Sequence, residues 1–298
     1  MGNRFISTLR LLSSSVVVAI SGWCRLYIAF LFLGRDPELK SCTAFSMVVY
    51  SVYMFDRAAS GIEDEINRRH LKASMKNLGI AVSLAAFSLG VFLSGFTVAC
   101  FVPYLIGFAY SRGIHAGNLT LRLKGGRGVK NIVVALTWGA TIVLFMMAWI
   151  ESLATLAVIF IFFSTKSFIN TIIYDFRDID GDLKAGIPTL PIYIGESKTK
   201  LLLQTLNVLI HLFLLIMMVL GIANPEYLIL LTCFICGVVY TTFLARRDIG
   251  SSYRTKILRD AIVDGEFILA VIFREILSSS TFLGSTQTAL SPREVQSC

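Results

Sequence analysis

Long apolar runs are the feature that most constrains the fold of this chain. A membrane-spanning helix needs about 20 predominantly apolar residues, with about 17–25 tolerated. Nine segments meet or approach that length: 11–33, 41–56, 78–94, 96–112, 130–149, 152–175, 201–222, 227–244 and 258–279. The first run is long enough to span and lacks a small-residue cleavage site, so we interpret it as a span rather than a signal peptide. The sequence therefore predicts an all-α, polytopic membrane helical bundle with about nine transmembrane helices.

Composition agrees with lipid as the main solvent. Of 298 residues, 55% are hydrophobic and 15% are charged, whereas a soluble domain carries about 25% charged residues. The net charge of +8 comes from basic residues that flank the spans, a pattern that indicates topology and lipid headgroup contact rather than nucleic-acid binding. Cys233 and Cys236 form a C-x-x-C inside an apolar segment with no second ligand pair or His nearby, which favours core packing over zinc or redox chemistry.

The connecting loops alternate in charge. Four loops carry four or five Lys and Arg each: 57–76, 112–130, 177–200 and 246–259. The loops after the third, fifth and seventh predicted spans carry none. Because Lys and Arg concentrate in cytoplasmic loops, the basic loops and the N-terminus are predicted inside and the C-terminus outside. We expect one membrane domain over 1–280 and a disordered, Ser/Thr-rich tail over 281–298.

The strongest chemical motif follows the sixth predicted span. Asp175, Asp178 and Asp182 have the spacing i, i+3 and i+7, which stacks three carboxylates on one face of a helix. Such a stack is repulsive unless a cation lies among the groups. Oxygen-only ligands favour a hard ion, and Mg²⁺ typically shares its coordination sphere with substrate phosphates. Arg177 and Lys184 lie close enough in sequence to add positive charge toward such phosphates. The alternative is a solvated acidic loop at the headgroups.

A second acidic motif ends the second predicted span, and charge alternation places it on the same side of the membrane. Asp56, Ser60 and Asp64 are spaced i, i+4 and i+8, and Arg57 follows the first of them. Two acidic helix ends at one surface could hold Mg²⁺ ions across a diphosphate leaving group. By itself this loop could equally be an ordinary charged surface loop with internal salt bridges.

Other candidates are weaker. The basic, Gly-rich loop before the fifth span could wrap a phosphate, or could be a flexible positive-inside loop; its candidate ligands are Arg122, Lys124, Arg127, Lys130 and Asn131. Tyr53 and Tyr174 lie near the acids and could line an apolar cleft that shields a carbocation, or could belong to an interfacial aromatic belt. Arg25 is an intramembrane charge for which we expect a structural pairing or snorkelling.

At these acidic loops the sequence resembles the UbiA superfamily of membrane prenyltransferases. The resemblance rests on D-x-x-D-x-x-x-D at Asp175, Asp178 and Asp182, then Lys184, Gly186, the run Thr189-Leu190-Pro191 and Gly195. The nine-span layout extends it over nearly the whole chain. The resemblance implies Mg²⁺-dependent ionisation of a polyprenyl diphosphate and transfer of the prenyl group to an acceptor in a lateral cavity open to lipid.

The first motif departs from the family pattern N-D-x-x-D-x-x-x-D. Aligned on Asp64, the Asn position is Asp56, the first Asp is Arg57 and the middle Asp is Ser60. Loss of a ligand at Ser60 and gain of a cation at Arg57 should weaken metal binding in this half of the site, and Arg57 could contact the diphosphate directly. We interpret the chain as a divergent member with an intact second motif.

These observations predict a Mg²⁺-dependent membrane prenyltransferase that acts on an aromatic or lipid acceptor. In this hypothesis Asp175, Asp178, Asp182, Asp64 and Asp56 hold metal. Substrate-binding residues are Lys184, Arg57, Asp56, Ser60, Arg122, Lys124, Arg127, Lys130, Asn131, Tyr53 and Tyr174. One alternative is a terpene cyclase of the same superfamily, which needs no acceptor. Another is an ion transporter, although transport acids usually lie near the bilayer midplane. Acceptor, chain length and oligomeric state are left open.

Overall fold

The structure is a computed structural model that describes most of the chain. The described residues are 12, 15–58, 73–95, 97–112, 114–116, 119–121, 127–149, 151–184, 186–247 and 253–289. Their α-helices are α2 (Val16–Phe32), α3 (Leu39–Ala58), α5 (Ala73–Leu93), α6 (Phe101–Arg112), α7 (Val129–Met146), α8 (Leu153–Lys184), α9 (Leu190–Tyr193), α10 (Glu196–Val219), α11 (Tyr227–Val239) and α12 (Tyr253–Ala289). Short 3₁₀ turns η1 (Val98–Cys100) and η2 (Met147–Trp149) and the π-helical segment η3 (Tyr240–Leu244) extend α6, α7 and α11.

Each predicted apolar run coincides with a helix, so the helical fold class is confirmed. Among the described helices, four are long and apolar enough to cross a membrane: Val129–Trp149, Leu153–Lys184, Glu196–Val219 and Tyr227–Leu244. One addition is a short antiparallel hairpin, β1 (Ile114–Ala116) with β2 (Leu119–Leu121), in a loop for which the sequence predicts no strand.

Two helices are longer than the hydropathy indicates. Helix α8 continues to Lys184, beyond the predicted span end at 175, so the whole D-x-x-D-x-x-x-D motif is helical. Helix α12 continues to Ala289, where the sequence predicts a disordered tail from 281. Hydropathy locates the end of the apolar run, but a helix ends only where its backbone hydrogen bonding ends, and polar residues can continue it.

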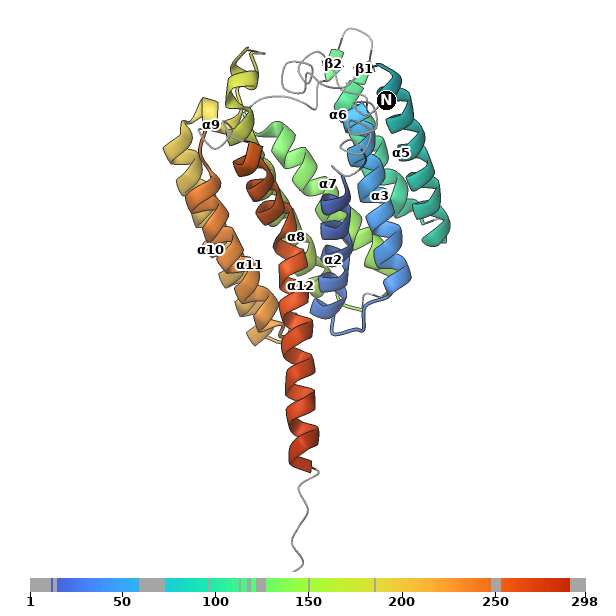
Figure 1. The fold of residues 1–298 in the computed structure, drawn as a ribbon, viewed down its shortest axis with the longest axis vertical. Helices are drawn as coiled ribbons and strands as arrows, with labels where there is room; N and C mark the ends of the chain where they lie inside the picture. The colour runs from blue at the N-terminus through green and yellow to red at the C-terminus, as the bar shows by residue number, and fades with distance from the viewer. Residues whose placement is uncertain are drawn as a thin grey trace, which may run out of the picture.

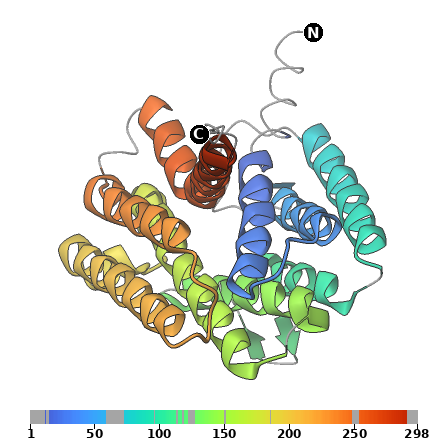
Figure 2. The same ribbon diagram turned by 90° about the horizontal axis from the view of Figure 1, so that it is seen from below.

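The helices form a closed ring when viewed along the bundle (Figure 2). Neighbours around it are α2, α3, α6, α7, α8, α10, α11 and α12, and α12 packs back on α2 to close it. Helix α5 lies outside this ring, against α3. The ends of α3, α6 and α8, the start of α7 and the short helix α9 all gather at one end of the bundle (Figure 1). The basic loops of the sequence therefore join helices at a common end.

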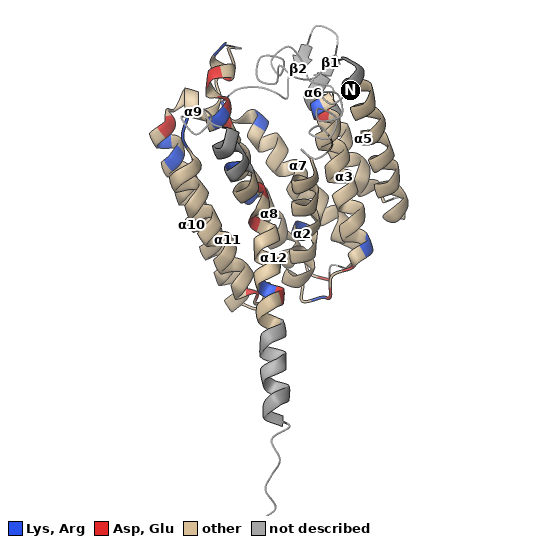
Figure 3. Cartoon of the chain, in the orientation of Figure 1, with Lys and Arg blue, Asp and Glu red and all other residues tan. Residues whose placement is uncertain are grey.

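Charged and apolar residues occupy different parts of the surface along the bundle axis. Many charged residues lie toward the two ends of the bundle, whereas α11 and most of α10 carry none (Figure 3). On α10, large apolar side chains face outward, among them Leu201, Leu209, Leu212 and Val219 at 64%, 54%, 49% and 72% exposure. An apolar belt of this kind fits a lipid environment.

Close packing of α7 on α8 depends on Gly139. A Cβ added there would collide with the Ser164 hydroxyl and lie 3.1 Å from the Phe160 carbonyl oxygen. We expect Gly139→Ala to lower the free energy of unfolding by about 1–3 kcal/mol, because overpacking forces the helices apart. The control is Gly265→Ala in α12, where nothing lies within 4 Å of the added Cβ; it should be neutral or stabilising, since Ala is the better helix former. Unfolding of both purified variants in detergent measures the difference, and equal stability would contradict the packing argument.

Candidate active site

A cavity of about 770 Å³ opens between six helices. Both acidic helix ends contribute to it. Its lining includes Val18 and Arg25 from α2; Val52, Tyr53, Asp56 and Arg57 from α3; Ile106 from α6; Lys130, Asn131, Thr137 and Trp138 from α7; Ser167, Asn170, Thr171, Tyr174, Asp175, Arg177 and Asp178 from α8; and Ala261 and Asp264 from α12. The structure therefore brings the end of α3 and the end of α8, which are more than 100 residues apart in sequence, to one site.

The acidic face of α8 is organised around Lys130. Its ammonium lies 2.7 Å from Asp175 Oδ1 and 3.7 Å from Asp182 Oδ2. Asn131 Nδ2 donates to the other Asp175 oxygen at 3.0 Å. Asp175 and Asp182 are 3% and 8% exposed. Two carboxylates that lie on one helical face and are this deeply buried need a cation near them. The Lys130 ammonium supplies that positive charge.

Asp178 lines the cavity, as Asp175 does, and its side chain is more exposed than those of Asp175 and Asp182. Arg177 Nε and Nη2 donate to its two oxygens at 2.6 and 2.7 Å. This is a bidentate pair between chain neighbours, at side-chain exposures of 24% and 28%. A partly solvated pair of this kind contributes little stability. Asp178 is therefore a carboxylate of the acidic face that lies at the cavity surface.

The donor set fits a hard divalent ion. Among the described residues, no three Asp, Glu, His or Cys side chains converge closely enough to hold one ion. Within the described part of the chain, the buried Asp182 Oδ2 nevertheless has no hydrogen-bond partner, and the Lys130 ammonium stands in the position of a cation between Asp175 and Asp182. The three carboxylates of α8 would offer a metal oxygen ligands only.

The α3 end of the cavity carries the altered motif. Asp56 and Arg57 line the cavity, and Arg57 Nη1 donates to Ser15 Oγ at 3.0 Å. The Arg57 guanidinium is therefore held near the acidic end by a contact with the residue that precedes α2. Asp64 and Ser60, the predicted partners in this motif, lie outside the described residues.

The remaining predicted ligands divide between the cavity and its surroundings. Tyr53 lines the cavity and stacks on Trp138 with ring centroids 5.8 Å apart, and Tyr174 lines it with the Arg177 and Arg259 guanidiniums 5.2 and 5.5 Å from its ring. Two of these predicted ligands among the described residues do not line the cavity: Arg127, whose guanidinium is 5.1 Å from the Tyr193 ring, and the exposed Lys184. Arg122 and Lys124 lie outside the described residues.

The structure adds polar cavity residues that the motifs do not single out. Arg25, Asn170 and Asp264 all line the cavity, although Arg25 is expected from the sequence on the side away from the acids. The available signal for Arg25 and Asp264 is their charge inside apolar segments, which is costly in a membrane and therefore points to a role.

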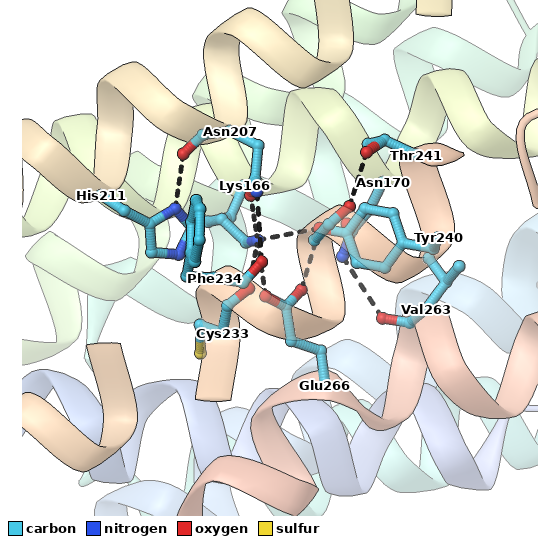
Figure 4. Close-up of polar contacts among 11 residues, drawn as sticks. Lys166, Asn170, Asn207, His211, Cys233, Phe234, Tyr240, Thr241, Val263 and Glu266 are labelled. Carbon is cyan, nitrogen blue, oxygen red and sulfur yellow. Dashed lines mark hydrogen bonds and ion pairs between the residues drawn. The ribbon is translucent and has the colours of Figure 1, made fainter. Parts of the chain in front are cut away.

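A buried ion pair lies behind the cavity wall (Figure 4). Lys166 Nζ is 2.5 Å from Glu266 Oε1, and both side chains are fully buried. Tyr240, the first residue of η3, accepts a hydrogen bond from Lys166 at 2.8 Å and donates one to Glu266 at 3.2 Å. Lys166 also contacts Asn207 Oδ1 at 3.3 Å. The network connects α8, α10, η3 and α12, and so fixes the two helices that carry Asp175 and Asp264.

Comparisons with known proteins identify the family of the chain. The model of the UbiA prenyltransferase family matches residues 66–258. The chain belongs to this family. Family membership and the apolar helices make it an integral-membrane prenyltransferase.

Two similar proteins carry the same name. A digeranylgeranylglyceryl phosphate synthase of Natronomonas pharaonis is 30% identical over 196 residues, which cover 65% of this chain and 69% of that protein. The enzyme of the same name from Methanococcus aeolicus is 29% identical over 176 residues, 51% of this chain and 55% of that protein. A UbiA homologue from Archaeoglobus fulgidus, solved with DMAPP and Mg²⁺, superposes with a TM-score of 0.56 at 17% identity and covers 90% of this chain and 98% of its own. At that identity the likeness establishes the fold.

Proposed function

We propose that this protein transfers a prenyl group from a polyprenyl diphosphate to an aromatic or lipid acceptor inside the membrane, with Mg²⁺ as cofactor. The observation that carries the proposal is the junction of Asp56, Arg57, Lys130, Asp175 and Asp178 at one cavity. The family and a Mg²⁺- and DMAPP-bound homologue support it.

In this proposal the diphosphate lies at the acidic end of the cavity. Asp175, Asp178 and Asp182 hold Mg²⁺, with Asp56 and Asp64 contributing from the other side. Bound Mg²⁺ would neutralise the charge that develops on the leaving diphosphate. Lys130 leaves its carboxylate partners and donates to phosphate oxygens, as do Arg57 and Arg177. The proposed diphosphate-binding residues also include Lys184, Ser60, Asn131, Arg122, Lys124 and Arg127.

The part of the cavity beyond its acidic end is suited to the prenyl chain. Its wall combines apolar side chains with the aromatic faces of Tyr53, Trp138 and Tyr174. Aromatic faces attract a cation, and water excluded from the site cannot quench an allylic cation before the acceptor does.

The chain would form one membrane domain over 1–280 with nine spans, with its N-terminus and the acidic end of the cavity in the cytoplasm.

The test is release of pyrophosphate and formation of prenylated product. Purified full-length protein in lipid nanodiscs is incubated with dimethylallyl, geranyl and longer prenyl diphosphates, with phenolic or glycerolipid acceptors, with and without Mg²⁺. We expect acceptor-dependent product only with Mg²⁺, and none after chelation by EDTA. Absence of pyrophosphate release with every diphosphate would refute the proposal. A hydrocarbon or terpene alcohol formed without acceptor would identify the cyclase alternative instead.

A further inference from the structure

The polar lining of the cavity is not confined to its acidic end. Arg25, Ser167, Asn170 and Asp264 form a second polar group, here called the polar floor. With a rise of about 1.5 Å per helical residue, Asn170 and Ser167 lie about 7.5 and 12 Å along α8 from Asp175. A site that held only a hydrocarbon chain would gain nothing from charged groups at this depth, because they are costly in a membrane.

Three helices meet at the polar floor. Arg25 Nη1 from α2 donates to Ser167 Oγ on α8 at 3.1 Å, and the same guanidinium lies 4.7 Å from the ring of Phe267 on α12. Phe267 is one helical turn from Asp264. Asn170 Nδ2 on α8 donates to the carbonyl of Val263 at 3.5 Å, so Asn170 lies beside the same turn of α12. Tyr53 on α3 lines the same cavity as Arg25 and Asp264.

Two buried polar atoms at the polar floor have no hydrogen-bond partner among the residues that the structure describes. Asn170 is 4% exposed, and its Oδ1 accepts no hydrogen bond from these residues; the Arg25 Nε–H donates none to them. Buried polar atoms are nearly always satisfied, so an unpaired donor and an unpaired acceptor indicate a missing ligand or water. A hydroxyl group both donates and accepts, so it matches this pair, whereas a prenyl chain matches neither atom.

The depth of the polar floor suits an acceptor. If the diphosphate is held at Asp175, the first prenyl carbon lies below it, and a nucleophile must come within about 3–3.5 Å of that carbon on the side away from the leaving group. The level of Asn170, about one and a half turns below Asp175, is where such a nucleophile would be.

Building on the proposed function, we propose that the polar floor is the acceptor subsite, that it takes a hydroxyl-bearing acceptor, and that Asp264 accepts the hydroxyl proton. Arg25 and Asn170 orient the hydroxyl. The bond between the first prenyl carbon and the diphosphate oxygen breaks, and its electron pair leaves with the diphosphate. The acceptor oxygen forms the new bond to that carbon, and its proton passes to the Asp264 carboxylate, which becomes neutral.

The experiment separates ionisation from acceptor capture. Wild type, Asp264→Asn and Asp264→Glu are compared in nanodiscs with geranyl diphosphate, Mg²⁺ and one of two acceptor pairs. The pairs are a monoprenylated glycerol ether with one free hydroxyl beside its methyl ether, and a simple phenol beside its methyl ether. Pyrophosphate release without acceptor and prenylated product with acceptor are both measured, and thermal unfolding confirms that each variant is folded.

Wild type should prenylate at least one free hydroxyl and neither methyl ether. Asp264→Asn should lower product formation by about 100-fold or more, in line with loss of a general base. Product formation should fall about tenfold or more beyond any fall in acceptor-free pyrophosphate release, because the proton acceptor serves the capture step. Asp264→Glu should recover part of the product formation.

Product formation by Asp264→Asn within threefold of wild type would overturn the role of Asp264, and equal use of the methyl ethers would overturn the hydroxyl subsite. Pyrophosphate release that persists in wild type while only cyclised product forms would overturn both the acceptor subsite and prenyl transfer to an acceptor. If wild type releases no pyrophosphate, the proposed function fails, and this inference fails with it.

Discussion

Replacing Lys166 with methionine is expected to destabilise the protein by about 3–5 kcal/mol, because Glu266 would keep a buried charge without its counter-ion. Both side chains are fully buried and lie 2.5 Å apart. Glu266→Gln should have an effect of similar size, since it leaves the Lys166 ammonium without a carboxylate. Chemical unfolding of the purified variants in detergent, followed by intrinsic fluorescence, gives the free energies.

The double variant Lys166→Met/Glu266→Met provides the control for this first prediction. With both charges removed, the variant should recover most of the stability lost by either single change, because an apolar pair of similar volume avoids desolvation of two ions. The coupling energy from the double-mutant cycle should therefore be large. Simple additivity of the two single effects would mean that the pair is solvated, contrary to the structure.

Replacing Asp178 with asparagine is expected to lower Mg²⁺-dependent pyrophosphate release by about 10²–10³-fold, the usual cost of removing one group that stabilises charge in the transition state. The change keeps the size of the side chain and removes one carboxylate from the acidic face of α8. Asp178 pairs with an adjacent arginine at partial exposure, so stability should change by less than about 1 kcal/mol. Initial rates at saturating prenyl diphosphate measure the effect.

Asp180→Asn is the matched control for Asp178→Asn. Asp180 lies on the same turn of α8 but pairs with Arg247, and its side chain is 66% exposed. Because it does not line the cavity, its removal should leave the rate within about twofold, a difference below about 0.5 kcal/mol. If Asp180→Asn reduces activity as strongly as Asp178→Asn, the effect is general electrostatics at the helix end rather than ligation.

The sequence predicts the broad architecture well because apolar length and loop charge are local properties. The runs near 130–149 and 201–222 correspond to α7 and α10 with boundary differences of a few residues. The spacing of Asp175, Asp178 and Asp182 also predicts their arrangement, because on a helix it places the three carboxylates on one face. What the apolar pattern misses is the continuation of α8 to Lys184, because hydropathy follows the solvent rather than the backbone hydrogen bonds.

Other features of the site depend on contacts between segments distant in sequence. Lys130 is predicted as a phosphate ligand in a flexible loop, whereas in the structure it is the counter-ion of Asp175, across 45 positions of sequence. Lys166 is noticeable as an intramembrane charge, but its partner Glu266 is 100 residues away. The role of Asp264 likewise requires the closure of α12 on α2. One sequence cannot specify such pairs, because the periodicity of apolar residues and the composition carry no information about which residues are neighbours in the folded chain.

The central claim is that the carboxylates of α8 and the end of α3 hold metal and diphosphate together. It is tested most directly by a structure of the full-length protein with Mn²⁺ and a non-hydrolysable prenyl thiodiphosphate, in which anomalous scattering locates the metal. We predict a Mn²⁺ peak within coordination distance of Asp178 and Asp182, with Lys130 moved from Asp175 onto a phosphate oxygen. A metal and diphosphate bound elsewhere, with Lys130 still bridging Asp175 and Asp182, would contradict the account.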